Sequence, residues 1–415
     1  MSPDATLRHR YETGFSLIEL MVGMTIGFIA MVVIVQALSV FEGHKRTTTA
    51  AADAQENGLL AMMAIEADIR KAGAGFNHPA SFACRNFFSY YQDTSGAGAP
   101  VAVGSFMPVP VLIDDVGTTN DTIHVRSGLR FTGSVPTKLV KPMDTLTAAP
   151  DLLLEVERPY DFNGAPATAT DPPADLIMVV GNDPDYINCS LMQVSSKAGS
   201  VLTIANGPAG KKPEYNATQT YMTANNWPGF GTGGAGFLTG SLVYRVGNTT
   251  AGGVQSTSYS VNANNSLQAV VRLSGAAVPT TDTEVVASEI VALQAQYGVS
   301  LTKTDRTINS WVNGSGATWG KVALTANTST ASDNRQRIKA IRIAVVARSS
   351  KRDGALVSNP CMDTATSAIL YYGPCSWEGG PAIALGSSAD TEWQHYRYRV
   401  YQTVIPMRNV LWPDL

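Results

Sequence analysis

The chain has few charged residues. Asp, Glu, Lys and Arg make up 15% of its 415 residues, whereas they make up roughly 25% of an ordinary soluble domain. The formal net charge is −3, so the basic surface that a nucleic-acid-binding protein needs is missing. Hydrophobic residues nevertheless account for 44% of the chain, which is enough to build a core and excludes a wholly disordered protein.

Residues with catalytic or metal-binding chemistry are also scarce. There are five histidines, and none stands at metal-binding spacing from another histidine or a cysteine. The motifs GxSxG and HExxH and the P-loop lysine do not occur. One GxGxxG match, at residues 229–234, precedes a predicted strand instead of following one, so it lacks the context of a nucleotide site. The sequence therefore predicts no catalytic residue, no metal site and no cofactor.

Only one long apolar run occurs, from Phe15 to Leu38, and it contains a single charged residue, Glu19. A helix of this length can cross the roughly 30 Å hydrocarbon core of a membrane. Gly23 and Gly27 form a GxxxG pair, which allows close helix–helix packing in lipid. A carboxylate inside a membrane segment costs on the order of 3 kcal/mol unless it is paired, so Glu19 is a candidate functional residue.

Three interpretations of this run compete. A secretory signal peptide has an apolar core of about 7–15 residues followed by a small-residue cleavage site. Val35-Gln36-Ala37 offers such a site, but the run is too long and holds a carboxylate. A plain membrane anchor explains the length and leaves Glu19 unexplained. The third interpretation accounts for both features and depends on residues 14–20.

The string GFSLIEL at residues 14–20 resembles the cleavage and methylation motif of type IV prepilins and type II secretion pseudopilins. The resemblance implies that a prepilin peptidase removes a leader, residues 1–14, by cutting between Gly14 and Phe15, and then methylates the Phe15 amine. It also implies that Glu19 faces that amine, on its own or a neighbouring subunit, when subunits dock in the membrane. Pairing makes two otherwise costly charges tolerable in lipid.

The helix is predicted to continue beyond its transmembrane half, residues 15–38. There is no proline from Ser39 to Lys71, and Gly73, Gly75 and Pro79 follow, so we expect one helix over residues 15–72. One face of its second half is apolar, and we expect that face to pack on the head. The residues that mark it are Leu59, Met62, Met63 and Ile69.

Residues 73–415 show short alternating apolar runs separated by Gly, Pro, Asn and Asp, which predicts a large antiparallel β-rich head. The expected strands are Thr122–Arg126, Leu152–Glu157, Leu176–Val180, Ser190–Val194, Val201–Ala205, Ser241–Val246, Thr257–Val261, Leu267–Leu273, Ile338–Arg348 and Tyr396–Ile405. Residues 285–297 favour a helix or a helix–strand junction. Residues 207–240 and 302–333 are rich in Gly, Asn, Thr and Ser and predict long surface loops. The expected fold class is α+β, a long N-terminal transmembrane helix followed by a β-rich globular head.

Four further stretches resemble minor pilins of the PilW type: Ala67–Gly73, Asp121–Ile123, Val291–Val299 and Arg397–Asn409. The resemblance implies a pilin-like minor pilin, a structural protein that helps initiate type IV pilus assembly and sits at or near the pilus tip. The implied partners are the prepilin peptidase, other minor and major pilins, the inner-membrane assembly platform, and membrane lipid around residues 15–38. No nucleic acid is among them.

The same resemblance implies a location. Before assembly the chain would be a single-pass protein of the inner membrane with its head in the periplasm, and after assembly it would belong to the extracellular filament or its tip. Two alternatives stay open. One is a type II secretion pseudopilin, and the other is a membrane-tethered adhesin or binding module whose long loops carry the ligand surface.

The cysteines are Cys84, Cys189, Cys361 and Cys375. In an exported head they would meet an oxidising periplasm, where disulfides form and persist. Four cysteines allow three connectivities. Cys361–Cys375 closes a short loop that ends in Gly-Pro, which leaves Cys84–Cys189 as the second bridge. Unpaired buried thiols are the alternative.

Overall fold

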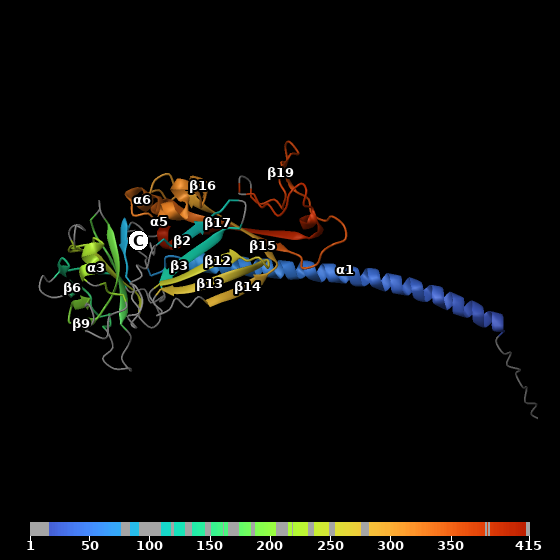
Figure 1. Ribbon diagram of the computed structural model, residues 1–415, viewed down its shortest axis with the longest axis horizontal. Coiled ribbons are helices and arrows are strands. Elements are labelled where there is room, and N and C mark those ends of the chain that lie inside the picture. Colours follow the sequence, from blue (N-terminus) through green and yellow to red (C-terminus); the bar gives the residue numbers. More distant parts are fainter. Residues whose placement is uncertain are drawn as a thin grey trace, which may run out of the picture.

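A single long helix leaves a β-rich head and extends far beyond it (Figure 1). The computed structural model describes residues 16–75, 84–90, 109–117, 120–128, 135–145, 151–160, 162–164, 174–183, 187–204, 215–217, 219–230, 236–248, 254–274, 282–377, 380 and 382–411. Within these residues one long helix is followed by sheets whose strands pair almost entirely antiparallel and by a few short helices. The predicted fold class is confirmed.

The long helix α1 runs from Leu17 to Lys71 and has 55 residues, which corresponds to about 80 Å at 1.5 Å per residue. Glu19 lies in its first turn and Arg70 in its last, so both charges suit the helix dipole. The chain leaves α1 through Gly73 and Gly75, whose φ angles of 76° and 85° are readily adopted only by glycine. The first half of α1 is exposed, and the second half packs on the head.

Two antiparallel sheets receive the second half of α1. The first has the order β14-β13-β12-β3-β2, with β2 Val111–Asp114, β3 Thr122–Gly128, β12 Val254–Val261, β13 Ser266–Ser274 and β14 Asp282–Ser288. The second has the order β16-β15-β17-β20, with β15 Ile290–Val299, β16 Ser310–Asn313, β17 Ile338–Arg348 and β20 Tyr398–Pro406. Strands of both sheets contact α1. The helix and the two sheets enclose the main hydrophobic core.

A second pair of sheets forms what we call the distal lobe, the described residues between 84 and 248 apart from β2 and β3. One sheet has the order β1-β8-β7-β11-β4 and the other β5-β6-β10-β9. Their bounds are β1 Asn86–Phe88, β4 Thr137–Lys138, β5 Asp144–Thr145, β6 Leu152–Glu155, β7 Asp175–Val180, β8 Asn188–Gln193, β9 Ser196–Ala198, β10 Val201–Ile204 and β11 Leu242–Asn248. Pairing is antiparallel except between β1 and β8. The lobe lies at the end of the head away from the free half of α1 (Figure 1).

The distal lobe is joined to the rest of the head by a sheet that is buried on both faces. Every residue of β7 and of β8 is buried. In β7, Leu176 and Met178 belong to the main core, whereas Ile177 and Val179 belong to a second core inside the lobe. This shared sheet makes the two cores adjacent layers of one head.

The C-terminal part adds small elements on the outer face of the second sheet. They are β18 Cys361–Met362, β19 Ile369–Tyr371 and the 3₁₀ helix η1 Glu392–His395. The helix α7 Arg408–Leu411 lies instead at the end of α1, where the Asn409 side chain donates to the Ala72 carbonyl at 2.8 Å. Strands β18 and β19 pair only with each other in the part of the chain that the structure describes. A small apolar cluster that includes Val346 and Ile383 holds this region against β17.

All ten strands expected from the sequence are confirmed to within a few residues. The prediction of a helix or junction over residues 285–297 is wrong, because this stretch lies in strands β14 and β15. Nearly every residue of β15 is buried, so it lacks the alternation of polar and apolar residues that marks a half-exposed strand.

The two stretches expected to be surface loops contain packed structure, so that prediction is wrong as well. Residues 302–333 contribute β16, α4 Gly316–Trp319, α5 Lys321–Thr325 and most of α6 Ser329–Arg337, with Leu324 fully buried. In residues 207–240, the described part includes α3 Gln219–Ala224. Here Trp227, Phe230 and Phe237 are buried in the core of the distal lobe. These few aromatic and aliphatic residues fix segments that are otherwise polar and glycine-rich.

Candidate assembly interface

The N-terminal end of α1 is organised around Glu19. Ser16 precedes the first helical residue, and its backbone N–H donates a hydrogen bond to Glu19 Oε2 at 3.0 Å. A Ser followed three residues later by Glu is a capping pattern that satisfies backbone N–H groups left open at a helix start. Gly14 and Phe15 lie outside the described residues, so cleavage and methylation there stay predictions.

Among the residues that the structure describes, none buries the apolar half of α1. This helix is long and apolar enough to cross a membrane, and none of its most apolar stretch is buried inside the structure. A Cβ built on Gly23 or Gly27 would meet no atom within 4 Å. The two glycines therefore leave an open strip on an exposed apolar surface, and their role in helix packing stays a prediction about other chains.

The second half of α1 packs on the head through small residues. The buried residues on this face are Ala50, Ala54, Ala61, Met62, Ile65, Ile69 and Ala72. Gly58 belongs to the same face, because a Cβ built on it would lie 2.2 Å from Tyr401 Cε2. Small side chains at spacings of three and four residues let the helix approach β17 and β20 closely.

The expected packing face of α1 is half correct. Met62 and Ile69 are buried, whereas Leu59 and Met63 are 51% and 58% exposed. Successive helical residues are about 100° apart, so Leu59 and Met63 point away from the face that Ile65 and Ile69 occupy. Together with Leu60, they form an outward apolar surface that this chain leaves uncovered.

Two tyrosines bind α1 to the sheets. Tyr401 of β20 donates a hydrogen bond to the backbone carbonyl of Gln55 at 2.9 Å. Tyr259 of β12 donates one to Asp68 Oδ2 at 2.7 Å, and burial together with the Asp68 carboxylate raises the pKa of the Tyr259 phenol. These two hydrogen bonds fix how α1 is rotated about its own axis relative to the sheets. They therefore also fix the direction in which Leu59, Leu60 and Met63 point.

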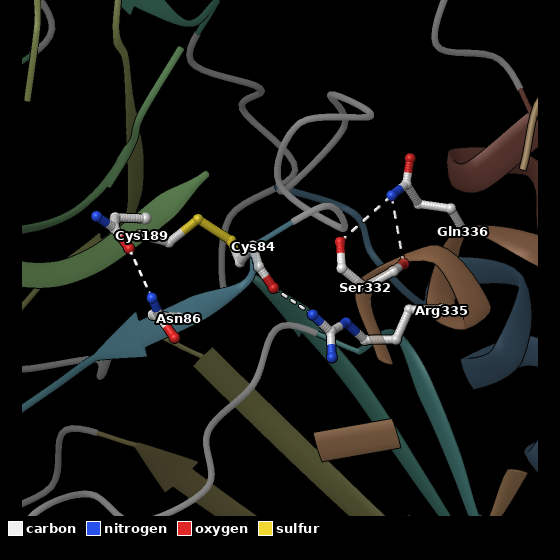
Figure 2. Close-up of a disulfide and its surroundings, with 7 residues drawn as sticks. Cys84, Asn86, Cys189, Ser332, Arg335 and Gln336 are labelled. Atoms are coloured by element: carbon white, nitrogen blue, oxygen red, sulfur yellow. Dashed lines mark hydrogen bonds between the residues drawn. A yellow bond between two sulfur atoms is a disulfide. The ribbon is translucent and has the colours of Figure 1, made fainter. Parts of the chain in front are cut away.

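One disulfide joins Cys84, which precedes β1, to Cys189 of β8 within the distal lobe. Cys84 and Cys189 are bonded, with Cα atoms 5.6 Å apart, and both residues are fully buried. Figure 2 shows this bond next to Asn86, whose side-chain N–H donates to Asn188 Oδ1 at 2.9 Å. The other disulfide joins Cys361 and Cys375. The pairing is the same as that expected from the sequence.

Arg335 of α6 completes this junction, and the sequence gives no signal for it. Its guanidinium donates to the Cys84 carbonyl (Figure 2) and, at 2.7 Å, to the Leu324 carbonyl. The side chain is buried, and burial lowers its pKa to about 10. Arg335 thereby links the helices α5 and α6 to the first disulfide.

A second arginine fastens the C-terminal elements. The Arg342 guanidinium of β17 lies 4.8 Å from the ring centre of Trp311 and 4.6 Å from that of Trp377. Its Nε also donates to Gln296 Oε1 at 2.7 Å. An arginine between two tryptophan faces is a favourable cation–π arrangement. It fixes the segment after Cys375 against the sheet.

The polar residues with possible metal or acid–base chemistry do not gather into a site. In the described ranges no group of three or more His, Cys, Asp or Glu residues could hold a metal ion. The ring of His124 contacts Ser258 Oγ at 2.7 Å between neighbouring strands. Asn182 donates to the Thr239 carbonyl at 2.7 Å. Both contacts connect strands and loops within the head.

Comparison with known proteins identifies two regions of the chain. Residues 243–409 match the family described as type IV pilus-assembly protein W, PilW. Residues 9–35 match the prokaryotic N-terminal methylation motif. No curated protein sequence matches the chain. Among solved structures, the type IV-like pilin TTHA1219 from Thermus thermophilus aligns with a TM-score of 0.21 and 15% identity, over 38% of this chain and 69% of that one.

The two matched regions correspond to the two parts of the structure described above. The methylation motif covers the start of α1 and implies processing by prepilin peptidase. The PilW match runs from β11 to α7, so it includes the whole second sheet and strands β12, β13 and β14 of the first sheet, but not β2 and β3. Assembly of a pilus implies other pilins as partners. Over residues 243–409 the chain is thus similar to the PilW type IV pilus-assembly proteins, and its N-terminus carries the methylation motif of prepilins.

Proposed function

We propose that this chain is a minor pilin that helps to start filament assembly and then occupies a position at or near the pilus tip. Before assembly, residues 15–38 hold it in the inner membrane with the head, residues 73–415, in the periplasm. There it meets the prepilin peptidase, other minor and major pilins, and the assembly platform. After assembly it belongs to the extracellular filament.

The position of the distal lobe is the observation that supports a tip location best. The lobe lies at the end of the head opposite the free half of α1 (Figure 1), and most of it precedes residue 243, where the PilW match begins. If subunits enter a filament from the membrane, that end faces the subunits already in place. A bulky lobe there is accommodated most easily where no subunit stands above it.

The outward surface of α1 supports incorporation among other pilin helices. Leu59, Leu60 and Met63 are about half exposed and form a second apolar surface on α1, separated from that of its first half by the mostly polar residues 42–57. Exposed apolar patches of this kind mark contact sites. In the membrane, Gly23 and Gly27 would let a neighbouring helix approach, and Glu19 would pair with a methylated Phe15 amine to set the axial position of the subunit.

Gene deletion followed by immunogold labelling tests this function. Deletion should abolish or strongly reduce surface pili while type II secretion continues. An epitope on the distal lobe of the complementing protein should label one end of sheared filaments. Loss of secretion with normal piliation would favour a secretion pseudopilin instead. Label along the whole filament length would contradict a tip position.

A further inference from the structure

Two open depressions lie on opposite sides of α1 where it enters the head, and Ala54 lines both. The first has a volume of about 330 Å³ and includes Gln55, Arg397 and Arg399. We call it the cationic flank. The second has a volume of about 450 Å³ and includes Asp53, Glu56, Glu289 and Arg348. We call it the anionic flank.

The cationic flank holds one arginine that this chain does not use. Arg397 donates to Asp353 Oδ2 at 3.0 Å, so its charge is largely balanced. The side chain of Arg399 is exposed and forms no hydrogen bond or ion pair with any residue that the structure describes. The aliphatic and small residues around it, Ala51, Ala54 and Val357, leave the guanidinium accessible from outside.

The anionic flank shows the opposite imbalance. Arg348 and Glu289 satisfy each other, with Arg348 Nη2 2.7 Å from Glu289 Oε2. The side chains of Asp53 and Glu56 on α1 are exposed, and their carboxylates make no hydrogen bond or ion pair among the described residues. One side of the helix therefore presents an unpaired cation, and the other side, at the same level, presents two unpaired carboxylates.

Opposite charges on opposite sides suit a contact that repeats along a helical assembly. Subunits related by a rotation and a translation meet through two different surfaces, so one flank of a subunit faces the other flank of its neighbour. We propose that the cationic flank binds the acidic α1 flank of a neighbouring pilin subunit, with Arg399 pairing with a carboxylate of that helix. This inference rests on the proposed function, and it adds a contact at the level of the head to those in the membrane.

The neighbour is expected to carry the acidic pattern that this chain itself shows at Asp53 and Glu56. Small residues at Ala51 and Ala54 would allow the second helix to come close. Charge complementarity also discriminates between partners, because two cationic flanks would repel each other. A pilin with basic residues at this level of its helix is therefore excluded as the neighbour on this side.

Zero-length crosslinking tests the contact in intact cells. The Arg399→Lys variant keeps the positive charge and supplies an amine that a carbodiimide can join to a touching carboxylate. Mass spectrometry of sheared filaments should find an amide between that amine and an Asp or Glu of a pilin subunit, in its N-terminal helix. Arg399→Gln should give no such product, and the exposed amine of Lys138 in the distal lobe should give none with a pilin helix.

Charge reversal provides the second readout. Arg399→Glu should lower the amount of this chain recovered in filaments at least threefold, while Lys138→Glu, the same change in the distal lobe, should leave it unchanged. An amide only with Asp353 of the same chain, or a product with a protein that is not a pilin, would overturn the inference. If the wild-type chain enters filaments without any product at position 399, only this inference fails. If the wild-type chain is absent from filaments, the proposed function fails with it.

Discussion

At the scale of single residues, Glu19 has two carboxylate oxygens, and the structure uses one of them. Oε2 accepts the Ser16 N–H, which leaves the second oxygen and the negative charge available to the amine that cleavage would create at Phe15. The same side chain can thus stabilise the start of α1 and neutralise a terminal charge. These two roles can be separated by substitution.

Substitution of Glu19 should impair assembly and leave cleavage intact. Glu19→Ala removes both the acceptor for Ser16 and the charge, whereas Glu19→Gln keeps an acceptor and loses the charge. We expect processed protein in the membrane fraction for both variants, with filament incorporation lowest for Glu19→Ala and intermediate for Glu19→Gln. Immunoblots of membranes and sheared filaments measure this. Equal incorporation of both variants and the wild type would mean that Glu19 does not drive docking.

Asp121 should make the stability of the head depend on pH. Its side chain is buried, one oxygen accepts the Ala295 N–H at 2.7 Å, and the other has no hydrogen-bond partner among the described residues. Burial raises its pKa from 3.8 to about 8, with a smaller contribution from nearby Asp115. Between these values the folded state binds the proton more tightly than the unfolded state, so stability falls as the pH rises from about 4 to about 8.

Thermal unfolding of the detergent-solubilised full-length protein at pH 5 and pH 8 measures this effect. The wild type should unfold at a lower temperature at pH 8 than at pH 5. Asp121→Asn has no proton to lose, so the difference between the two pH values should shrink. If the variant shows the full wild-type difference, another group is responsible for it.

At the scale of elements, the contact between α1 and β20 depends on the absence of a side chain at Gly58. A Cβ there would overlap the Tyr401 ring and lie 3.0 Å from Ala347 Cβ. Gly58→Ala should therefore destabilise the head by about 1–3 kcal/mol through overpacking. Gly43→Ala is the matched control on the same helix, because its Cβ would meet nothing within 4 Å. The control should be neutral or gain about 0.5–1 kcal/mol from helix propensity.

Denaturant unfolding of both glycine variants distinguishes the packing effect from a general effect of alanine in α1. A loss confined to Gly58→Ala supports the close contact with Tyr401. A loss of similar size in both variants would show that the contact does not decide the outcome.

The elements also show which parts of the fold the sequence could predict. In strands with one exposed face, such as β3 and β6, buried and less buried residues largely alternate. This alternation of every second residue made them predictable from the sequence. Strand β15 is buried on both faces between β16 and β17, so its pattern has no periodicity to distinguish it from a buried helix. On α1, the packing residues Ala50, Ala54 and Gly58 are too small to stand out in a hydrophobic pattern. The prediction instead placed the larger residues Leu59 and Met63 on the packing face, and both are exposed.

The candidate site was predictable where a short motif determines it. The spacing from Gly14 to Glu19 is a local signal that does not depend on the fold. Arg335 and Arg399 carry no such signal, because their roles come from what the folded chain places beside them: the Cys84 carbonyl in one case and an uncovered depression in the other. Only tertiary structure reveals such residues.

At the scale of the whole molecule, the two disulfides should differ in accessibility. Cys84 and Cys189 are fully buried and belong to the main core, whereas Cys375 is exposed. Mild reduction of the folded protein followed by alkylation should therefore label Cys361 and Cys375 first, and Cys84 and Cys189 only after unfolding. Peptide mapping by mass spectrometry measures the order. Early labelling of Cys84 would contradict the buried junction.

Different parts of the molecule provide the apolar helix, its attachment to the head, and the distal lobe. The first half of α1 is exposed and apolar, the second half is fixed by the two sheets, and the distal lobe is added at the far end (Figure 1). Most of the distal lobe precedes residue 243, where the PilW match begins. Differences in assembly role between pilins of this family are expected to lie there.

The central claim is that α1 enters a pilus after cleavage between Gly14 and Phe15. The N-terminal peptide of the chain recovered from washed, sheared filaments tests it most directly, by mass spectrometry. We predict a peptide that begins at Phe15 and carries one added methyl group. A chain that begins at Met1, or at Leu38 as after signal-peptidase cleavage, or one that is absent from the filaments, would contradict it.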